Sequence, residues 1–190
     1  RRLLDCYEEG ARRFGWDQRE ATPGSRREGE WLIGMGMAAA LRGNFTVNAE
    51  AEVILGDDGR ATVRTDMTDI GTGTYTILAQ TVGDMLGLPV EAIDVVIGDT
   101  DLPPSAGSGG SFGAGSACAA AALACEDVLA ELGRRMNAAP EDMRLKDGIV
   151  TAGARTSPLV DLVRGSPIAA RGKTSPGKES QATSQASHGA

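Results

Sequence analysis

Two glycine-rich stretches decide the fold of this chain, D-I-G-T-G-T at residues 69–74 and S-A-G-S-G-G-S-F-G at residues 105–113. Each stretch follows a segment with strand character and leads directly into a segment with helix character. A glycine turn in front of a helix presents unpaired backbone N–H groups at the positive end of the helix dipole, where anions bind. Two such turns with interleaved hydroxyl groups therefore predict a large anionic ligand that is held from two sides.

The segments around these turns alternate between strand and helix. Alternating apolar and polar residues at 49–55 and 60–66, separated by a Gly-Asp-Asp-Gly turn, predict a β-hairpin. An amphipathic helix is expected after the first glycine turn, a short strand at 93–97 and a long alanine-rich helix at 115–136. The sequence therefore predicts a mixed α/β (α+β) fold, a β-hairpin plus strand–helix–strand–helix layers, with both glycine turns at neighbouring strand ends.

The outer parts of the chain carry weaker signals. A helix is expected up to Gly15, followed by a polar loop at 16–30. The apolar run at 31–40 fits either a buried strand or a close backbone contact. A second hairpin is expected at 143–151 and a helical turn at 158–164.

From Gly165 onward the chain is dominated by proline, glycine, serine and lysine. This composition is typical of a disordered segment, although the same residues could form an ordered connection in a longer protein. The chain has no starting methionine and stops without a terminating element, so we interpret it as an internal piece of a longer polypeptide. Residues 1–165 are then part of one domain, and residues 166–190 are a polar connecting segment that is cut short.

Composition excludes several classes of function. With 190 residues, 41% of them hydrophobic, the chain can bury one sizeable core or two small ones. The net charge of −7 disfavours nucleic acid and anionic membranes as partners. No run approaches the roughly 18 apolar residues of a membrane span, and no signal-peptide pattern opens the chain. His188 in the polar tail is the only imidazole, which argues against histidine metal sites and Ser-His-Asp catalysis.

Cysteines and acidic residues have ordinary structural interpretations. Cys6, Cys118 and Cys125 show no metal spacing, and the latter two lie seven residues apart on one helical face, as buried small residues do. Acidic residues lie in and just after the strand at 93–97 and could suggest a divalent metal, but aspartates at strand ends, such as the last two of the three, usually make turns. The acidic residues concerned are Asp94, Asp99 and Asp101.

Each glycine stretch has an alternative interpretation. The first is a ligand loop or a plain strand-to-helix turn in which Thr74 caps the helix. It lacks the lysine of the ATPase phosphate loop and the third glycine of the dinucleotide fingerprint. The second is a ligand loop or a flexible linker, and its place between a strand and a strong helix favours the ligand loop.

Taken together, these blocks resemble the molybdenum-binding subunit of the xanthine dehydrogenase/aldehyde oxidase family. The matching blocks, in the family's order, are T-P-G-S-R-R-E-G-E-W-L-I-G-M-G-M-A (22–38), D-I-G-T-G-T-Y-T-I-L-A-Q (69–80), G-D-T (98–100) and S-A-G-S-G-G-S-F-G-A-G-S-A (105–117). The G-T-G and S-A-G-S-G-G variants are most similar to the bacterial periplasmic aldehyde oxidase branch. The resemblance covers about residues 1–165.

This resemblance implies mixed α/β subdomains around a buried molybdenum–molybdopterin cofactor, in its cytosine dinucleotide form in bacterial members. It implies oxidation of aldehydes to carboxylic acids, or hydroxylation of N-heterocycles, with water as the oxygen source. It also implies partner subunits that carry [2Fe–2S] clusters and FAD, no nucleic-acid partner, and a cytoplasmic location or export to the periplasm with a partner subunit.

The resemblance also assigns roles to residues. Gly71, Thr72 and Gly73 match the family's G-Q-G position, with threonine in place of glutamine, and residues 108–111 match the loop beneath the pterin and the metal. Ala106 and Gly107 match small residues that line the molybdenum pocket. The expected cofactor-binding residues are Ile70, Gly71, Thr72, Gly73, Ala106, Gly107, Ser108, Gly109, Gly110, Ser111, Gly113 and Ala114.

No catalytic residue is expected within this chain. The family's catalytic glutamate lies beyond Ala190 and another cofactor loop lies upstream of Arg1, so the fragment alone is expected to be inactive. Leu41 falls near an aromatic substrate wall of xanthine-specific members, which disfavours purine substrates. Two alternatives remain: a nucleotide- or phosphate-binding enzyme domain, which would need a lysine, arginine or metal cluster at a loop, and a non-catalytic interaction domain.

Overall fold

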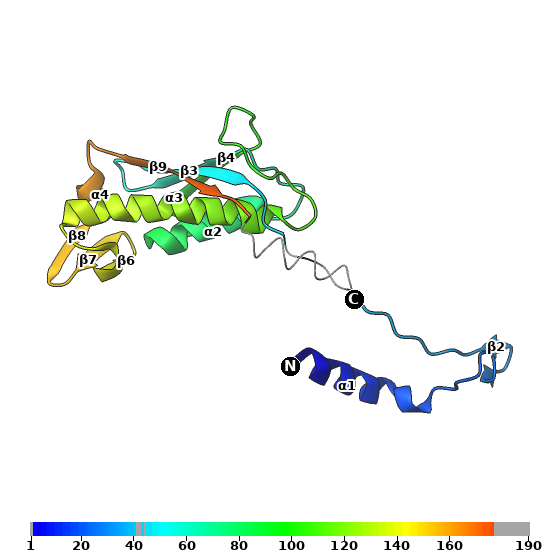
Figure 1. Ribbon diagram of the computed structural model, residues 1–190. Coiled ribbons are helices and arrows are strands. Elements are labelled where there is room, and N and C mark those ends of the chain that lie inside the picture. The colour runs from blue at the N-terminus through cyan, green and yellow to red at the C-terminus, as the bar shows by residue number, and fades with distance from the viewer. Residues whose placement is uncertain (1, 41–42, 44, 177–190) are drawn as a thin grey trace. The chain divides into compact units, whose positions relative to one another are not determined.

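The computed structural model describes residues 2–40, 43 and 45–176, and the chain divides into two units, Arg1–Arg42 and Gly43–Ala190. The smaller unit contains helix α1 (Arg2–Phe14), the 3-10 helix η1 (Trp16–Gln18) and the antiparallel strands β1 (Arg27–Glu28) and β2 (Trp31–Leu32) (Figure 1). The helix up to Gly15 is confirmed. Within this unit Trp31 is 75% exposed, so the expectation of a buried strand at 31–40 is wrong.

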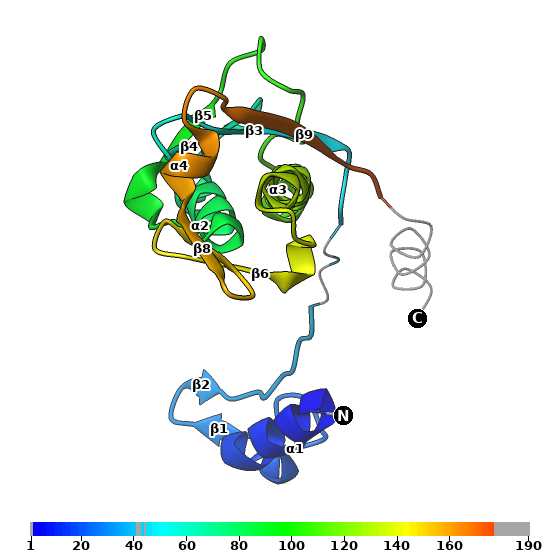
Figure 2. The same ribbon diagram turned by 90° about the vertical axis from the view of Figure 1, so that its left-hand side faces the viewer.

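The larger unit is built on a four-stranded sheet in the order β5-β4-β3-β9, in which β9 (Ile168–Thr174) is the last strand of the chain (Figure 2). Strands β3 (Ala49–Leu55) and β4 (Ala61–Thr65) form the expected antiparallel hairpin. The chain then passes through helix α2 (Thr74–Leu86) and returns in β5 (Ile93–Ile97), parallel to β4. This strand–helix–strand unit confirms the mixed α/β fold expected from the sequence.

Helix α3 (Gly113–Met136) packs beside α2 on one face of this sheet (Figures 1 and 2). The sheet contributes the buried side of β3, every second residue from Ala49 to Leu55. The helix contributes its alanines, because the backbones come close: a Cβ atom on Gly172 would lie 2.5 Å from the backbone nitrogen of Ala124. Small side chains on both elements therefore set the helix-to-sheet distance.

By length and composition α3 could cross a membrane, whereas the sequence analysis found no run that approaches a membrane span. Its alanine face is buried against the sheet, and its second half carries charged residues such as Glu131 and Arg135. These features are those of the core helix of a globular domain.

A second, three-stranded sheet follows the C-terminal end of α3. It consists of β6 (Met143–Lys146), β7 (Ile149–Ala152) and β8 (Arg155–Pro158), with the hairpin turn at Asp147-Gly148 that the sequence predicts. The short helical elements of this unit are η2 (Val90–Ala92), η3 (Pro140–Asp142) and α4 (Leu159–Val163).

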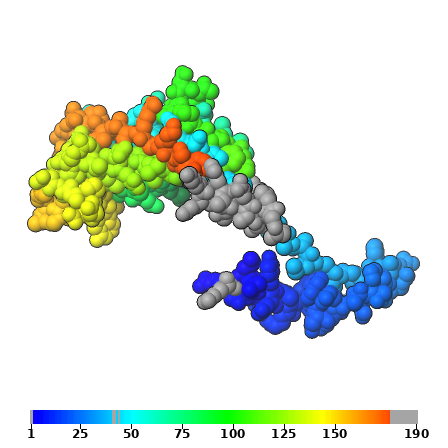
Figure 3. Space-filling view, viewed as in Figure 1, coloured from blue at the N-terminus to red at the C-terminus, as the bar shows by residue number. Residues whose placement is uncertain are grey.

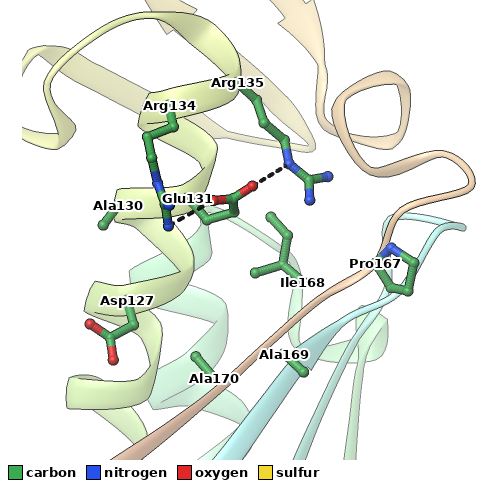
Figure 4. Close-up of a pocket in the computed structure, with 9 residues that line it drawn as sticks. All are labelled: Asp127, Ala130, Glu131, Arg134, Arg135, Pro167, Ile168, Ala169 and Ala170. Carbon is green, nitrogen blue, oxygen red and sulfur yellow. Dashed lines mark hydrogen bonds and ion pairs between the residues drawn. The ribbon is translucent and has the colours of Figure 1, made fainter.

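Arg135 ties this end of α3 to the segment that leads into the last strand. Its guanidinium donates hydrogen bonds to the carbonyl oxygens of Leu162 at 2.8 Å and Ser166 at 2.7 Å, and to the carboxylate of Glu131 at 2.9 Å. Arg135 and Glu131 border a surface hollow of about 470 Å³, where Arg134 also pairs with Glu131 (Figure 4).

The last strand, β9 (Ile168–Thr174), corrects one expectation. It pairs antiparallel with β3 along seven residues, with Ala49 opposite Thr174, and it lies along α3 (Figure 3). The expectation of disorder after Gly165 is therefore wrong for residues 168–174. Residues 177–190, with His188, and the position of Leu41 lie outside the described residues.

Candidate cofactor-binding loops

The two glycine stretches lie side by side at one edge of the main sheet. The first glycine loop (residues 66–73) follows β4, and the second glycine loop (residues 98–112) follows β5. Because β4 and β5 are parallel neighbours, their ends meet at the same edge, as expected from the sequence. The N–H group of Asp66 donates a hydrogen bond of 2.7 Å to the carbonyl oxygen of Pro103, which joins the bases of the two loops.

The carbonyl oxygen of Thr68 joins the loops a second time. It accepts a 2.5 Å hydrogen bond from the hydroxyl of Ser108 in the second loop and a 3.3 Å hydrogen bond from the hydroxyl of Thr74 at the start of α2. The hydroxyl oxygen of Thr72 lies 3.1 Å from that of Thr74. The structure thus connects two predicted site residues to one backbone carbonyl, Ser108 directly and Thr72 through the hydroxyl of Thr74.

Asp69 holds the first loop from within. One of its carboxylate oxygens accepts the N–H groups of Gly71 at 2.8 Å and Thr72 at 2.9 Å. Desolvation raises the pKa of Asp69, but backbone hydrogen bonds from Gly71, Thr72, Tyr75 and Thr74 outweigh it and hold the pKa below its usual range. The carboxylate is therefore ionised at neutral pH.

Two expectations for the first loop are corrected by this arrangement. The N–H groups of Gly71 and Thr72 are not unpaired, because the Asp69 carboxylate already accepts them. Thr74 does not cap α2: it is the first helical residue, Gly73 stands at the cap position, and no side-chain cap is made. The hydroxyl of Thr74 is directed back to Thr68 instead.

The second loop differs from the first in its backbone donors. Among the described residues, no hydrogen bond is made by the N–H groups of residues 107–111. Gly107, Gly110 and Ser111 have positive φ angles of 67°, 50° and 62°, a left-handed conformation that glycine adopts readily and serine rarely. A series of free N–H groups without a carboxylate partner suits an anionic ligand.

Open space lies in front of several of the predicted glycines. A Cβ atom on Gly71, Gly73 or Gly107 would meet no atom within 4 Å. Gly113 is different: it is buried, and a Cβ atom there would lie 2.8 Å from the carbonyl oxygen of Gly107 and against the side chain of Met67. Gly113 therefore serves the packing of the second loop onto the first.

The other predicted site residues are all accessible. Ile70 is 71% exposed beside the first loop. Ala106, Gly107 and Ser108 are half-buried, and the exposed members are Gly109, Gly110, Ser111 and Ala114. The loops are thus a surface of backbone donors, hydroxyls and one apolar side chain, which fits a polar cofactor with a flat ring system.

No candidate for metal ligation by side chains lies among the described residues, where no group of three His, Cys, Asp or Glu side chains is close enough to hold an ion. The carboxylate of Asp99 accepts the N–H of Asp101 at 2.9 Å, so the turn interpretation of these residues is confirmed. Cys125 is buried as expected, whereas Cys118 is half-buried and Cys6 exposed.

This fold and this pair of loops define a cofactor-binding domain, and the chain belongs to the molybdopterin cofactor-binding domain family, which matches residues 9–190. Over 170 residues it is 45% identical to the aldehyde oxidoreductase molybdenum-binding subunit PaoC of Escherichia coli strain K12, a match that covers 90% of this chain and 23% of that protein. The resemblance drawn from the sequence is confirmed.

Two further proteins are similar over shorter parts. The xanthine dehydrogenase molybdenum-binding subunit of Escherichia coli O157:H7 is 31% identical over 111 residues, which cover 54% of this chain and 14% of that protein. The crystal structure of quinoline 2-oxidoreductase from Pseudomonas putida 86 superposes with a TM-score of 0.58 at 27% identity, over 69% of this chain and 19% of that one. The chain thus spans less than a quarter of the length of these relatives.

Proposed function

We propose that this chain is the cofactor-cradling part of a molybdenum hydroxylase that oxidises aldehydes to carboxylic acids, or hydroxylates N-heterocycles, with oxygen taken from water. The observation that carries the proposal is the meeting of two glycine loops at the Thr68 carbonyl, with open space in front of Gly71, Gly73 and Gly107. The identity of 45% to an aldehyde oxidoreductase subunit favours aldehydes.

The residues of the two loops fit a pterin cofactor with a phosphate-bearing tail. The free N–H groups of residues 107–111 would donate hydrogen bonds to its anionic oxygens. The hydroxyl of Thr72, which donates to Thr74 while Thr74 donates to Thr68, would turn away from Thr74 to donate to the same ligand. Ile70 offers an exposed apolar side chain beside them. The bound cofactor would supply the redox and oxygen-transfer chemistry, while these residues bind and orient it.

Three finer features belong to the same proposal. The cofactor is the cytosine dinucleotide form, because the free backbone donors of the second loop, with no lysine beside them, suit an extended pyrophosphate. Partner subunits carry the [2Fe–2S] clusters and the FAD, in keeping with relatives that are themselves named as subunits. The general base is supplied from outside this chain, since Asp69, the acidic side chain beside Gly71 and Thr72 in the first loop, accepts their backbone N–H groups.

Metal and nucleotide analysis of the full-length protein that contains this chain tests the proposal. We expect molybdenum near one atom per chain and release of CMP on acid treatment. ATP-dependent phosphate transfer would instead support the nucleotide-binding enzyme domain. A protein with neither metal nor nucleotide would support the non-catalytic interaction domain and refute the proposal.

A further inference from the structure

The Asp69 carboxylate lies where the sequence alone would place the ligand's anion. It accepts two backbone N–H groups of the first loop, those of Gly71 and Thr72, at 2.8 and 2.9 Å. A carboxylate at this place is favourable because it faces the positive end of the α2 dipole. It also removes these donors from any external phosphate.

Around Gly71 and Gly73, the loop that Asp69 holds has no side-chain packing to fix its shape. Gly71 and Gly73 have φ angles of 94° and 76°, and no atom would contact a Cβ atom at either position. Glycines in open space lose more conformational entropy on ordering than other residues do. The hydrogen bonds of Asp69 therefore supply the restraint that side-chain packing supplies elsewhere.

The same short segment also reaches the second loop. Thr68, next to Asp69 in the chain, accepts the hydroxyl of Ser108 through its carbonyl oxygen. A first loop fixed by Asp69 consequently holds the Thr68 carbonyl in place for Ser108. The relative position of the two loops depends on this segment.

We propose that Asp69 is a positioning residue for cofactor binding, which fixes the first glycine loop in its receiving shape before the cofactor arrives. The first loop then presents the Thr72 hydroxyl and the Ile70 side chain, and does not bind a phosphate with the N–H groups of Gly71 and Thr72. This inference rests on the proposed function, in which the two loops hold molybdopterin. Its physical content is preorganisation, since a ligand that meets an ordered loop does not bear the entropy of ordering it.

Three variants of the full-length protein separate the roles of Asp69. D69A removes the acceptor, whereas D69N removes the charge and keeps a carbonyl oxygen that can accept the same N–H groups. D58A is the matched control: the Asp58 carboxylate accepts the N–H of Arg60 at 3.0 Å in the β3–β4 turn, the same local motif away from the loops.

The readouts are molybdenum and CMP content per chain, the rate of cofactor loss on dilution, and amide hydrogen exchange of peptides from residues 68–76. We expect D69A to lose the cofactor about tenfold faster than the unmodified protein, with faster exchange in these peptides, because its donors are left without their acceptor. D69N and D58A should retain the cofactor as the unmodified protein does.

Two results would overturn the inference: retention of the cofactor by D69A at the unmodified rate, or loss in D69N as fast as in D69A. If D69A does not fold, D69N alone decides: retention of the cofactor by D69N supports the positioning role of Asp69, and loss of the cofactor refutes it. Absence of molybdenum and CMP from the unmodified protein would refute the proposed function instead. The exchange of residues 68–76 in D69A and D69N would then still test whether Asp69 fixes the loop.

Discussion

The start of α3 offers a matched pair of substitutions, G113A and G115A, that tests how tightly the two loops are packed. Both glycines lie in the first turn of the helix, and neither has a positive φ angle. A Cβ atom on Gly113 would lie 2.8 Å from the carbonyl oxygen of Gly107, whereas one on Gly115 would meet no atom within 4 Å. The two variants therefore differ in the steric contact that the added methyl group makes, since only the one at position 113 meets the Gly107 oxygen and the Met67 side chain.

The magnitudes follow from that contact. Alanine is favoured over glycine in a helix by up to about 1 kcal/mol, so G115A should stabilise the start of α3 slightly. At Gly113 the side chain of Met67 can move aside, but the Gly107 oxygen belongs to the backbone of the second loop. Overpacking of this kind costs about 1–3 kcal/mol, so G113A should destabilise this region despite the helix preference of alanine.

Amide hydrogen exchange of peptides from residues 105–120 in the full-length protein measures both effects. A local loss of about 1.4 kcal/mol corresponds to roughly tenfold faster exchange. We expect exchange to be faster by about that factor in G113A and equal or slower in G115A, with a lower molybdenum content in G113A alone. Equal protection in the two variants would refute the close packing of Gly113 on Gly107.

Further predictions concern four other positions. R135A should lower the free energy of unfolding of the α4–β9 region by about 1–3 kcal/mol, because Arg135 donates hydrogen bonds to two backbone carbonyls. R134A removes an exposed ion pair and should change this free energy little. Amide hydrogen exchange of peptides from residues 159–170 checks both variants. Burial, with a smaller contribution from the charge of Glu126, raises the pKa of the Cys125 thiol to about 12, so iodoacetamide at pH 8 should label Cys125 only after unfolding, as mass spectrometry of the labelled peptides would show. T72V should weaken cofactor binding by about 1–3 kcal/mol if its hydroxyl donates to the ligand, with T76V on α2 as control, and unchanged molybdenum retention would leave Thr72 a structural role only. Because the pKa of Asp69 is lowered, the part of its ordering that comes from the negative charge should persist at every pH above the ordinary aspartate range of about 4 and be lost as pH falls through the lowered value. The protonated carboxyl should then hold the first loop no better than the amide of D69N, whose exchange should show no such transition.

The local elements of this fold could be predicted because their signals are contained in short stretches of sequence. The β3–β4 hairpin has strict alternation around a glycine turn, and the helices after each glycine loop have clear spacing and a glycine or asparagine at their ends. Strand β9 could not be predicted in this way. Its sequence I-A-A-R-G-K-T has strand-favouring residues only at its two ends, Ile168 and Thr174, and its structure depends on pairing with β3 and on packing against α3. Gly172, which weakens the strand signal, is the residue that allows the helix to approach.

The site could be predicted to the level of the loops but not to the level of single hydrogen bonds. The sequence located both glycine loops and their neighbouring positions, since parallel strands bring their ends together. It did not reveal that Asp69 accepts the N–H groups of Gly71 and Thr72, although an aspartate two residues before a glycine is a common turn pattern and was available as a signal. The direction of the Thr74 hydroxyl and the role of the Thr68 carbonyl depend on distances that no sequence pattern specifies.

The pairing of β3 with β9 has a consequence for the order in which this domain folds. Two ion pairs join β3 to β9: Glu52–Arg171, whose residues are 119 positions apart in the chain, and Glu50–Lys173, whose residues are 123 positions apart. The main sheet therefore cannot be completed until almost all of the described chain has been synthesised. Until then β3 is an open edge and the alanine face of α3 lacks part of its cover. Such long-range closure is slow and leaves the nascent chain exposed to wrong pairing. The strands β4 and β5, whose ends carry the two glycine loops, can pair earlier in synthesis. The sheet is complete only when β9 pairs with β3 at the edge opposite β5.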